Sequence, residues 1–354
     1  MINETKESLP LARFIYNPDW TPLKGVYIYP LKFFAADRSW DPNDYLEVIR
    51  VINVIGTDVA ITRGGGLFVR NHGQFKTPES IDQLVLLFNL LLCEFAFEGL
   101  EPEPVTYTDV QDAKLIGRHV SITGGYGSYA HKTYGPFALL ASGVRDMGKG
   151  YSTPSTLWAP NVFWLPHDAT IVERIAGLPN ALCLNQLSPT LPTLLVAAVS
   201  HSARRNVAET VVSSWIVCEQ ILSYLWSEHV ARVPDIEQRK VGPRSSVIIV
   251  PDKERKTRLE DTRTYSASVR AEVLLTAGVL PADTYGLLQA ARKIRNDLAH
   301  RTVVVQRSTI TTNNAMRAML RQLRVSVDRL PSYYFGEGGL GPTPQGLEPE
   351  FPFK

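Results

Sequence analysis

Apolar residues recur every three to four positions in the second half of the chain, from about residue 191 onward. The stretch Thr193–Val230 contains no proline, and this spacing places its apolar residues on one face of a helix. The apolar positions on that face are Val211, Val212, Trp215, Ile216, Cys218, Ile221, Leu222 and Leu225. The pattern predicts one long helix that ends before Pro234.

Three further helices are predicted after it. They span about Lys253–Thr276, Pro281–Arg301 and Ser308–Leu330, and they end at Gly278, after Arg301 and at Pro331. The apolar positions of the middle one are Leu287, Ala291, Ile294 and Leu298. The composition of residues 234–252 predicts a basic loop or a short hairpin around residues 247–250. Four helices with short connections indicate a four-helix-bundle-like, all-α domain.

The first half of the chain has mixed character. A strand is predicted at residues 25–29, and a hairpin is predicted where Asp58–Thr62 and Leu67–Val69 flank three glycines. Tyr45–Ile55 has apolar residues at helix-like spacing and is predicted to be helical. A second helix begins at Pro78 after the N-cap Thr77, and it ends before Gly99.

These patterns predict an α+β N-terminal domain over residues 1–189, which could be a sensor or regulatory domain, and a helical domain over residues 190–330. The Pro/Gly-rich tail 331–354 is predicted to be disordered or to act as a docking strap. Residues 124–166 are rich in Gly, Ser, Tyr and Pro and are expected to form loops.

Charge is distributed unevenly between these regions. Residues 190–330 hold 21 Lys and Arg against 13 Asp and Glu, residues 1–189 hold 15 against 19, and the tail holds 1 against 3. A basic region beside an acidic one indicates a polyanionic partner for the basic region, although solvated helix faces explain the same charges equally well.

The cysteines and the longest apolar run restrict the class of protein. Cys93, Cys183 and Cys218 lie far apart without a C-x-x-C pair, which argues against a disulfide framework and a thiolate zinc site. The polar segment 1–10 does not look like a signal peptide. Leu84–Phe97 is too short to cross a bilayer and predicts a buried helix. We therefore expect a cytoplasmic protein with no membrane partner.

One short motif carries candidate chemistry. The third predicted helix ends in Arg295-Asn296-Asp297-Leu298-Ala299-His300, the one place where an arginine precedes a histidine by five positions. This R-x4-H spacing is weak by itself. Its position at the end of an amphipathic helix, in the basic region, gives it weight.

These residues resemble the HEPN superfamily (higher eukaryotes and prokaryotes nucleotide-binding domains), whose hallmark is an arginine, then a polar residue that is often Asn, His or Asp, and then a histidine completing R-x4-6-H. The helix at Ser214–Leu222 also resembles the family's early helix. The resemblance covers about residues 191–330. The layout of the whole chain is similar to that of Apea-like HEPN proteins, which carry an α/β region before the bundle.

The chemistry of metal-independent RNA cleavage fits the motif. A group must take the proton from the ribose 2′-OH, a group must protonate the departing 5′-oxygen, and positive charge must meet the phosphate. His300 suits proton transfer near neutral pH, and Arg295 suits a two-point grip on phosphate. Asn296, one turn before His300, suits orienting the imidazole or holding a phosphate oxygen.

Arg295 and His300 are separated by about 140° around an ideal helix, so one helix does not aim both at one atom. Two facing copies of the helix would solve this, and the resemblance implies the same arrangement. We therefore expect a homodimer with a composite active site.

Two acidic residues and several basic residues are candidates for supporting roles at this site. Asp297 and Glu219 are candidate supporting acids, although each is equally explained as an ordinary surface charge. Lys293, Arg292 and Arg301 are candidate RNA-binding residues. A further basic set suits either RNA attraction or a solvated loop. Its members are Arg239, Lys240, Arg244, Lys253, Arg255, Lys256 and Arg258.

The sequence thus predicts a metal-independent endoribonuclease without cofactors. The family resemblance implies a toxin or anti-phage setting, with tRNA or other host RNA as the substrate and a partner that inhibits or activates it. The alternative is a non-catalytic HEPN-type module that binds a nucleotide or a protein, with Arg295, Asp297 and His300 as surface charges at a helix end. A separate enzyme in residues 1–189 has no residue pattern in its favour, and a phosphate cradle at Thr123–Tyr129 lacks the Walker lysine.

Overall fold

The structure is a computed structural model of the chain. It describes residues 22–27, 31–32, 47–62, 65–116, 119–122, 163–164, 175, 178–232, 235–240, 246–251, 253–301, 307–330, 333–336 and 339–342. The chain forms two compact units. One comprises Met1–Asn185 together with Asp328–Pro331, and the other comprises Gln186–Val327 together with Ser332–Lys354.

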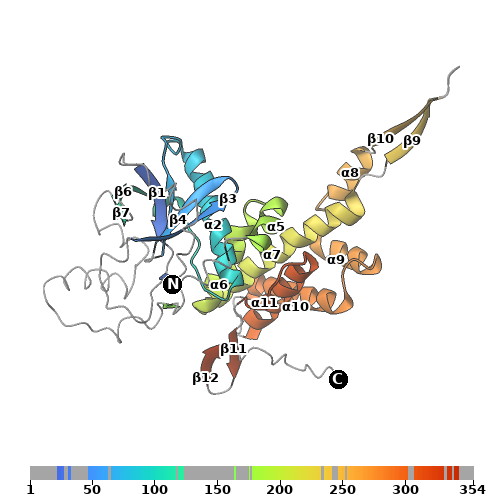
Figure 1. Cartoon of the computed structure of the whole chain (residues 1–354). Coiled ribbons are helices and arrows are strands. Elements are labelled where there is room, and N and C mark those ends of the chain that lie inside the picture. The colour runs from blue at the N-terminus through green and yellow to red at the C-terminus, as the bar shows by residue number, and fades with distance from the viewer. Residues whose placement is uncertain are drawn as a thin grey trace, which may run out of the picture. The chain divides into compact units, whose positions relative to one another are not determined.

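The first unit is built on a six-stranded sheet with the order β3-β4-β5-β1-β6-β7, in which all neighbours are antiparallel (Figure 1). The strands are β1 (Pro22–Tyr27), β3 (Val48–Val54), β4 (Thr57–Thr62), β5 (Gly66–Arg70), β6 (Gln111–Ile116) and β7 (His119–Ile122). β2 (Leu31–Lys32) and β8 (Phe163–Trp164) form a separate parallel pair. The predicted strand at β1 and the predicted β4–β5 hairpin are confirmed.

The helix predicted at Tyr45–Ile55 is wrong, because Val48–Val54 is strand β3. Five of its seven residues are β-branched, and such side chains favour an extended backbone when they pack on a sheet. Val48, Val51, Ile52 and Val54 are buried. Pairing with β4 therefore overrides the apparent helical spacing.

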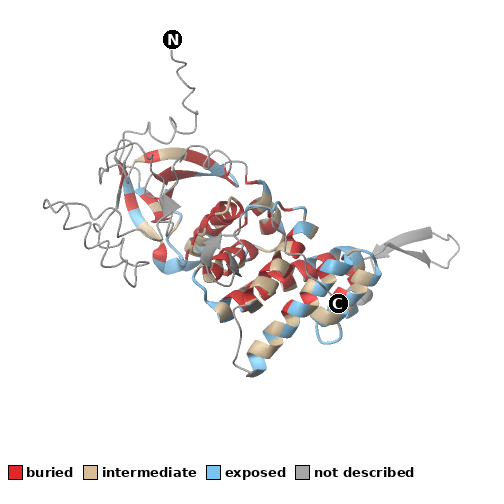
Figure 2. Ribbon diagram, turned by 90° about the horizontal axis from the view of Figure 1, so that it is seen from below, coloured by how far each residue is buried: buried red, intermediate tan, exposed pale blue. Residues whose placement is uncertain are grey.

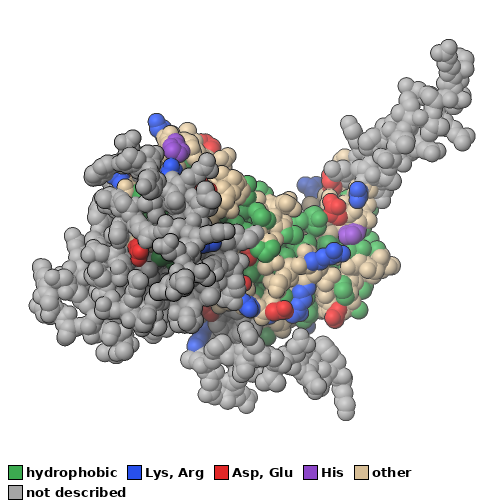
Figure 3. Space-filling model, in the orientation of Figure 1, with side chains coloured by type: hydrophobic (Ala, Val, Ile, Leu, Met, Phe, Trp, Pro, Cys, Tyr) green, Lys and Arg blue, Asp and Glu red, His purple; other side chains and the backbone are tan. Residues whose placement is uncertain are grey.

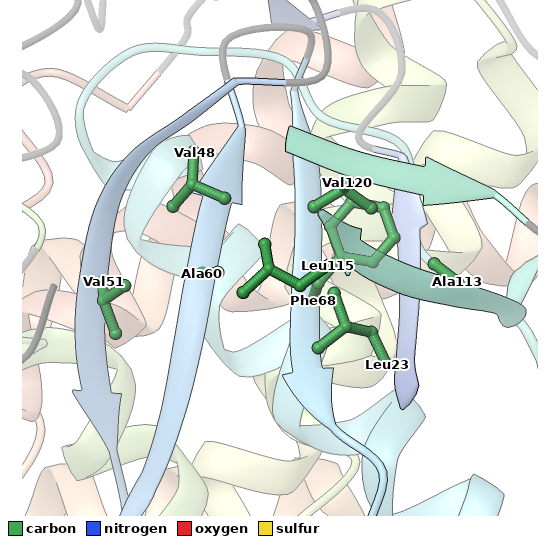
Figure 4. Packing of buried hydrophobic residues seen from close by; sticks show 8 residues of the cluster. All are labelled: Leu23, Val48, Val51, Ala60, Phe68, Ala113, Leu115 and Val120. Carbon is green, nitrogen blue, oxygen red and sulfur yellow. The ribbon is translucent and has the colours of Figure 1, made fainter. Parts of the chain in front are cut away.

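Apolar side chains from all six strands of the sheet pack together. Figure 4 shows this cluster, which comprises Leu23, Val48, Val51, Ala60, Phe68, Ala113, Leu115 and Val120. Gly25 of β1 faces Phe68 of β5, and a Cβ atom at Gly25 would overlap with that ring and with the Leu67 carbonyl oxygen. The ring of Phe68 thus occupies the space that any larger residue at position 25 would need.

Helix α2 (Pro78–Phe97) begins and ends as its local sequence predicts. Thr77 caps it by accepting a hydrogen bond from the amide of Ser80, Ser80 bonds back to the amide of Thr77, and Gly99 follows at φ +89°. Its length and apolar composition would suffice to cross a membrane, but most of that apolar stretch is buried within the protein. It therefore has the character of a core helix.

Two buried polar side chains connect α2 to the rest of its unit. Asn89 donates to the carbonyl of Val105 and accepts from its amide, both at 2.9 Å. Glu94 accepts a 2.6 Å hydrogen bond from the amide of Ala181, in the first turn of α5 (Pro179–Leu187). Burial raises the pKa of Glu94, whereas its bonds to the Ala181 and Asn180 amides oppose that rise.

The second unit is mainly helical, as predicted. Its helices are α6 (Leu191–Ala203), α7 (Val207–Trp226) with a π-helical extension at Ser227–Ala231, α8 (Lys253–Glu260), α9 (Ala267–Thr276), α10 (Ala282–Arg301) and α11 (Arg307–Gln322). Figure 2 shows buried residues on the inward faces of these helices and in the sheet. The predicted hairpin is present as β9 (Asp235–Lys240) and β10 (Ser246–Pro251).

The predicted helix Thr193–Val230 is two helices rather than one. The backbone breaks at Arg204–Asn206, where Arg205 adopts a left-handed φ of 59°. A buried amide joins both halves to α11: Ser214 Oγ donates to Asn313 Oδ1, and Asn313 Nδ2 donates to Ser202 Oγ, each at 2.9 Å. Packing of α6 against α7 and α11 therefore overrides the continuous apolar pattern.

Several finer predictions also need correction. The predicted helix Lys253–Thr276 divides into α8 and α9 at a turn in which Asp261 accepts bonds from Arg263 and Thr264. Helix α11 ends at Gln322, not Leu330, and Arg324 follows at φ +60°. Val212 is 42% exposed rather than part of the packed face.

Two predictions about packing and the tail are also wrong in part. In α10 the buried residues are Thr284, Leu288 and Ala291, so of the predicted core positions only Ala291 is fully buried. Part of the tail forms a hairpin of β11 (Tyr333–Gly336) and β12 (Gly339–Pro342). Of the loops predicted over residues 124–166, Phe163–Trp164 forms strand β8, and the rest of that range lies outside the described residues, as does Thr123–Tyr129.

Candidate functional site

Helix α10 carries the whole R-x4-H motif. It begins after Pro281, with Asp283 accepting a 2.9 Å hydrogen bond from the amide of Thr284. Thr284, Leu288 and Ala291 are buried, so packing fixes the first half of the helix. The motif occupies its last turns, where the side chains of Arg295 and His300 are exposed.

Arg295 and Asn296 are joined directly. Nη1 of Arg295 donates a 3.2 Å hydrogen bond to Oδ1 of Asn296. This bond directs the guanidinium toward the side of the helix on which Asn296 lies. The side-chain amide of Asn296, which lies one turn before His300, therefore also positions Arg295. The sequence did not suggest this second role.

His300 lies one residue before the end of α10 and is open to solvent. Within one copy of the chain, no hydrogen bond joins it to Arg295 in the residues that the structure describes. The helix keeps the two side chains about 140° apart. A single α10 therefore presents an anion-binding group and a proton-transfer group on different sides.

The neighbouring cations differ in their surroundings. Lys293 is exposed, whereas Arg292 is half-buried, and its Nε is buried without a hydrogen-bond partner among the described residues. Arg301 ends the helix, and its side chain lies outside the described residues. Lys293 and Arg292 are thus available along the helix that bears the motif.

The two predicted supporting acids occupy different elements. Asp297 is half-buried in α10 and interacts with other residues, and Glu219 is half-buried in α7. No ion pair joins Glu219 to Arg295 within the described ranges. The suggested support of Arg295 by Glu219 stays a prediction.

Charge on the helical unit is mixed rather than uniform. On the face seen in Figure 3, its basic side chains are interspersed with acidic ones over the described residues. A uniform basic patch is therefore not the feature that sets α10 apart on that face. The specific placement of Arg292, Lys293, Arg295 and His300 along one helix is a stronger reason to consider it as a site.

Nucleophilic or metal chemistry has little support among the described residues. Burial raises the pKa of the Cys93 and Cys218 thiols far above the neutral range, so neither supplies a thiolate. All three cysteines are free. No group of three or more His, Cys, Asp or Glu side chains in the described residues could hold a metal ion.

Sequence reasoning missed one buried cation. Arg270 of α9 is buried against Trp226, with its Cζ 5.6 Å from the ring centroid, and it donates long bonds to Ser223 Oγ and to the Glu260 carbonyl. Burial lowers its pKa, and Glu260 opposes that shift. These contacts join α9 to α7 and explain Arg270 as a structural residue.

No protein-family model, curated protein or solved structure matches the chain.

Proposed function

We propose that the helical unit is a metal-independent endoribonuclease of the HEPN type. The observation that carries this proposal is the arrangement of side chains at the end of α10. There the guanidinium of Arg295 donates to the side chain of Asn296, and Asn296 lies one turn before the exposed His300. A phosphate-binding fork and a group suited to proton transfer are what cleavage without metal requires.

The proposed reaction is transesterification within the RNA. The 2′-oxygen loses its proton and attacks the adjacent phosphorus, the bond from phosphorus to the 5′-oxygen breaks, and that oxygen takes a proton. The products are a 2′,3′-cyclic phosphate and a free 5′-hydroxyl. His300 takes part in the proton transfers, and Arg295 neutralises charge that grows on the phosphate oxygens.

Two copies of the chain complete the proposed site. The angular separation on one helix prevents Arg295 and His300 of the same copy from meeting at one phosphate. A symmetric dimer with facing α10 helices places Arg295 of one copy opposite His300 of the other, and it creates two such pairs. Arg292, Lys293 and Arg301 then contribute positive charge along the approach of the RNA.

A non-catalytic module is the second candidate. The observation in its favour is the lack of any bond between Arg295 and His300 within one copy. In that case, the same exposed groups would bind a nucleotide phosphate or an acidic partner. The family resemblance implies a toxin or anti-phage system that acts on tRNA or other RNA. This setting applies to the first candidate, the endoribonuclease.

The test is digestion of RNA by the full chain in EDTA. We expect cleavage that leaves cyclic phosphate ends, with a loss of at least a hundredfold in His300→Ala and Arg295→Ala, typical of the removal of a proton-transfer or charge-stabilising group. His229→Ala and Arg321→Ala replace an exposed histidine and an exposed arginine outside α10 and serve as matched controls. Equal cleavage by all four variants would exclude the assignment.

A further inference from the structure

The stretch Gln186–Val327 of the helical unit is connected to the first unit at both of its ends. The chain leaves the first unit after Asn185, within α5, and it returns to that unit for the four residues Asp328–Pro331. The stretch between them begins with α6 and ends shortly after α11. The contacts that fix these two connections within the first unit therefore bear on both ends of the helical stretch.

Glu94 of α2 fixes the outgoing connection. Its side chain is buried, and Oε1 accepts a 2.6 Å hydrogen bond from the amide of Ala181, while the amide of Asn180 also donates to the carboxylate. Both amides belong to the first turn of α5, where backbone N–H groups have no acceptor within their own helix. A carboxylate from another helix thus caps α5, and it does so most strongly when it is ionised.

Glu98, one turn later on α2, fixes the returning connection. Its Oε2 accepts a 2.7 Å hydrogen bond from Nη1 of Arg329 in an ion pair, and its side chain is only 19% exposed. The next residue, Gly99, lies so close to the backbone of Arg329 that an added Cβ atom would be 2.9 Å from the carbonyl oxygen. Leu330 is buried beside them in sequence. The returning segment is therefore seated on the C-terminal end of α2.

The two carboxylates are neighbours on one face of α2. The amide of Glu98 donates to the carbonyl of Glu94 at 3.0 Å, so the helical turn continues through both residues and brings their side chains close together. Both side chains are largely removed from water, which leaves their mutual repulsion poorly screened. Glu98 accordingly raises the pKa of Glu94. Arg329 offsets this repulsion, because it places a cation on Glu98.

We propose that Glu94 and Glu98 form a coupled latch, in which the returning segment and α5 are held or released together. With Arg329 on Glu98, Glu94 stays ionised and bonded to α5. When α5 detaches, Glu94 loses the amides that stabilise its charge, takes up a proton and attracts Arg329 less strongly. Each contact therefore strengthens the other by the same factor, as reciprocity between two binding events requires.

The latch acts on both ends of the helical stretch. Helix α6 follows α5 directly, and α11 precedes the returning segment, where Arg317 of α11 donates a 3.0 Å bond to the carbonyl of Val327. Helix α11 packs against α10 and is joined to α6 through Asn313. A ligand of the first unit that drew Arg329 away from Glu98 would thus free both ends at once. This inference does not depend on the activity of the helical unit.

Amide hydrogen exchange of the full chain at pH 7 tests the latch, followed by mass spectrometry on peptides that cover residues 178–187. Arg329→Gln should speed exchange at Asn180 and Ala181 by about threefold or more, although a guanidinium cannot itself bond to an amide N–H. Glu98→Gln breaks the same ion pair, yet exchange should stay equal or become slower, because the repelling charge is lost as well. The double variant should return exchange to the wild-type rate.

Two further variants calibrate the measurement. Lys24→Gln removes the cation from the 3.0 Å ion pair of Lys24 with Asp112 in the same unit, and it should leave exchange over residues 178–187 unchanged. Glu94→Gln removes the charged acceptor and should give the fastest exchange, about tenfold above the wild type. Unchanged exchange in Arg329→Gln would overturn the latch. Equal acceleration in Glu98→Gln and in the double variant would overturn it too, because the ion pair would then act through packing alone.

Discussion

Glu101 is a carboxyl that the fold has partly removed from water. Burial raises its pKa to about 7. The folded protein therefore holds a proton on Glu101 over a range in which the unfolded chain has released it. The contribution of Glu101 to the free energy of unfolding is fully present below the ordinary pKa of a glutamate, and it is lost as the pH rises through about 7.

Glu101→Gln should remove this dependence. At pH 8 we expect the variant to be more stable than the wild type by about 2 kcal/mol or less, because the glutamine carries no charge to desolvate. At pH 4 the two should be equal. Urea unfolding at both pH values measures the difference, and Glu272→Gln, which replaces an exposed carboxyl, is the control. A variant destabilised at pH 8 would contradict the expected sign.

Gly25 allows strands β1 and β5 to pack closely around the ring of Phe68. Gly25→Ala should destabilise the first unit by about 3 kcal/mol, because its Cβ meets both the ring of Phe68 and backbone that cannot rotate away. Gly286→Ala in α10 is the matched contrast, since nothing lies near its added methyl group. It should stabilise the helix by about 0.5 to 1 kcal/mol. Urea unfolding of both variants would show opposite shifts.

At the scale of elements, local signals account for the successful predictions. Thr77, Pro78 and Gly99 mark the ends of α2 without help from the rest of the chain. The β4–β5 hairpin follows from two apolar runs around glycines. Pro281 likewise marks the start of helix α10, although the packed face of this helix is not the one that its apolar spacing predicted.

Elements that depend on distant partners were not predictable in this way. Strand β3 is extended because it pairs with β4 and buries Val51 and Val54. The break between α6 and α7 depends on Asn313, about a hundred residues away in sequence. At the candidate site, the motif was predicted, but the bond from Arg295 to Asn296 and the half-burial of Arg292 required the three-dimensional structure.

The amide of Asn313 provides a test of that distant dependence. Asn313→Ala should destabilise the helical unit by about 2 to 3 kcal/mol, because it leaves the Ser202 and Ser214 hydroxyls buried without this partner. The triple variant Asn313→Leu, Ser202→Ala, Ser214→Ala should recover part of the loss, since it removes the unpaired groups. Thermal unfolding is the measurement. A triple variant no better than Asn313→Ala would show that the network matters only as packing.

At the scale of the whole molecule, the proposed nuclease depends on two copies. Arg295→Ala and His300→Ala should each be inactive alone, yet a refolded equal mixture should recover roughly a quarter of wild-type activity, because half of the dimers are mixed and each keeps one intact pair. Mixing either variant with itself is the control. If Arg295 and His300 acted within one copy, the mixture would stay inactive.

The segment Asp328–Pro331 belongs to the first unit although it follows the helical unit in sequence. Arg329 donates a 2.7 Å bond to Glu98 in an ion pair, and Leu330 is buried. The stretch Gln186–Val327 of the second unit is therefore inserted in sequence between two parts of the first unit, and the chain returns to the second unit at Ser332. A protease cut or a premature stop codon near residue 327 would therefore destabilise the first unit, although most of that unit precedes residue 186. A fragment ending at residue 185 would lack the segment Asp328–Pro331, which is part of its own fold.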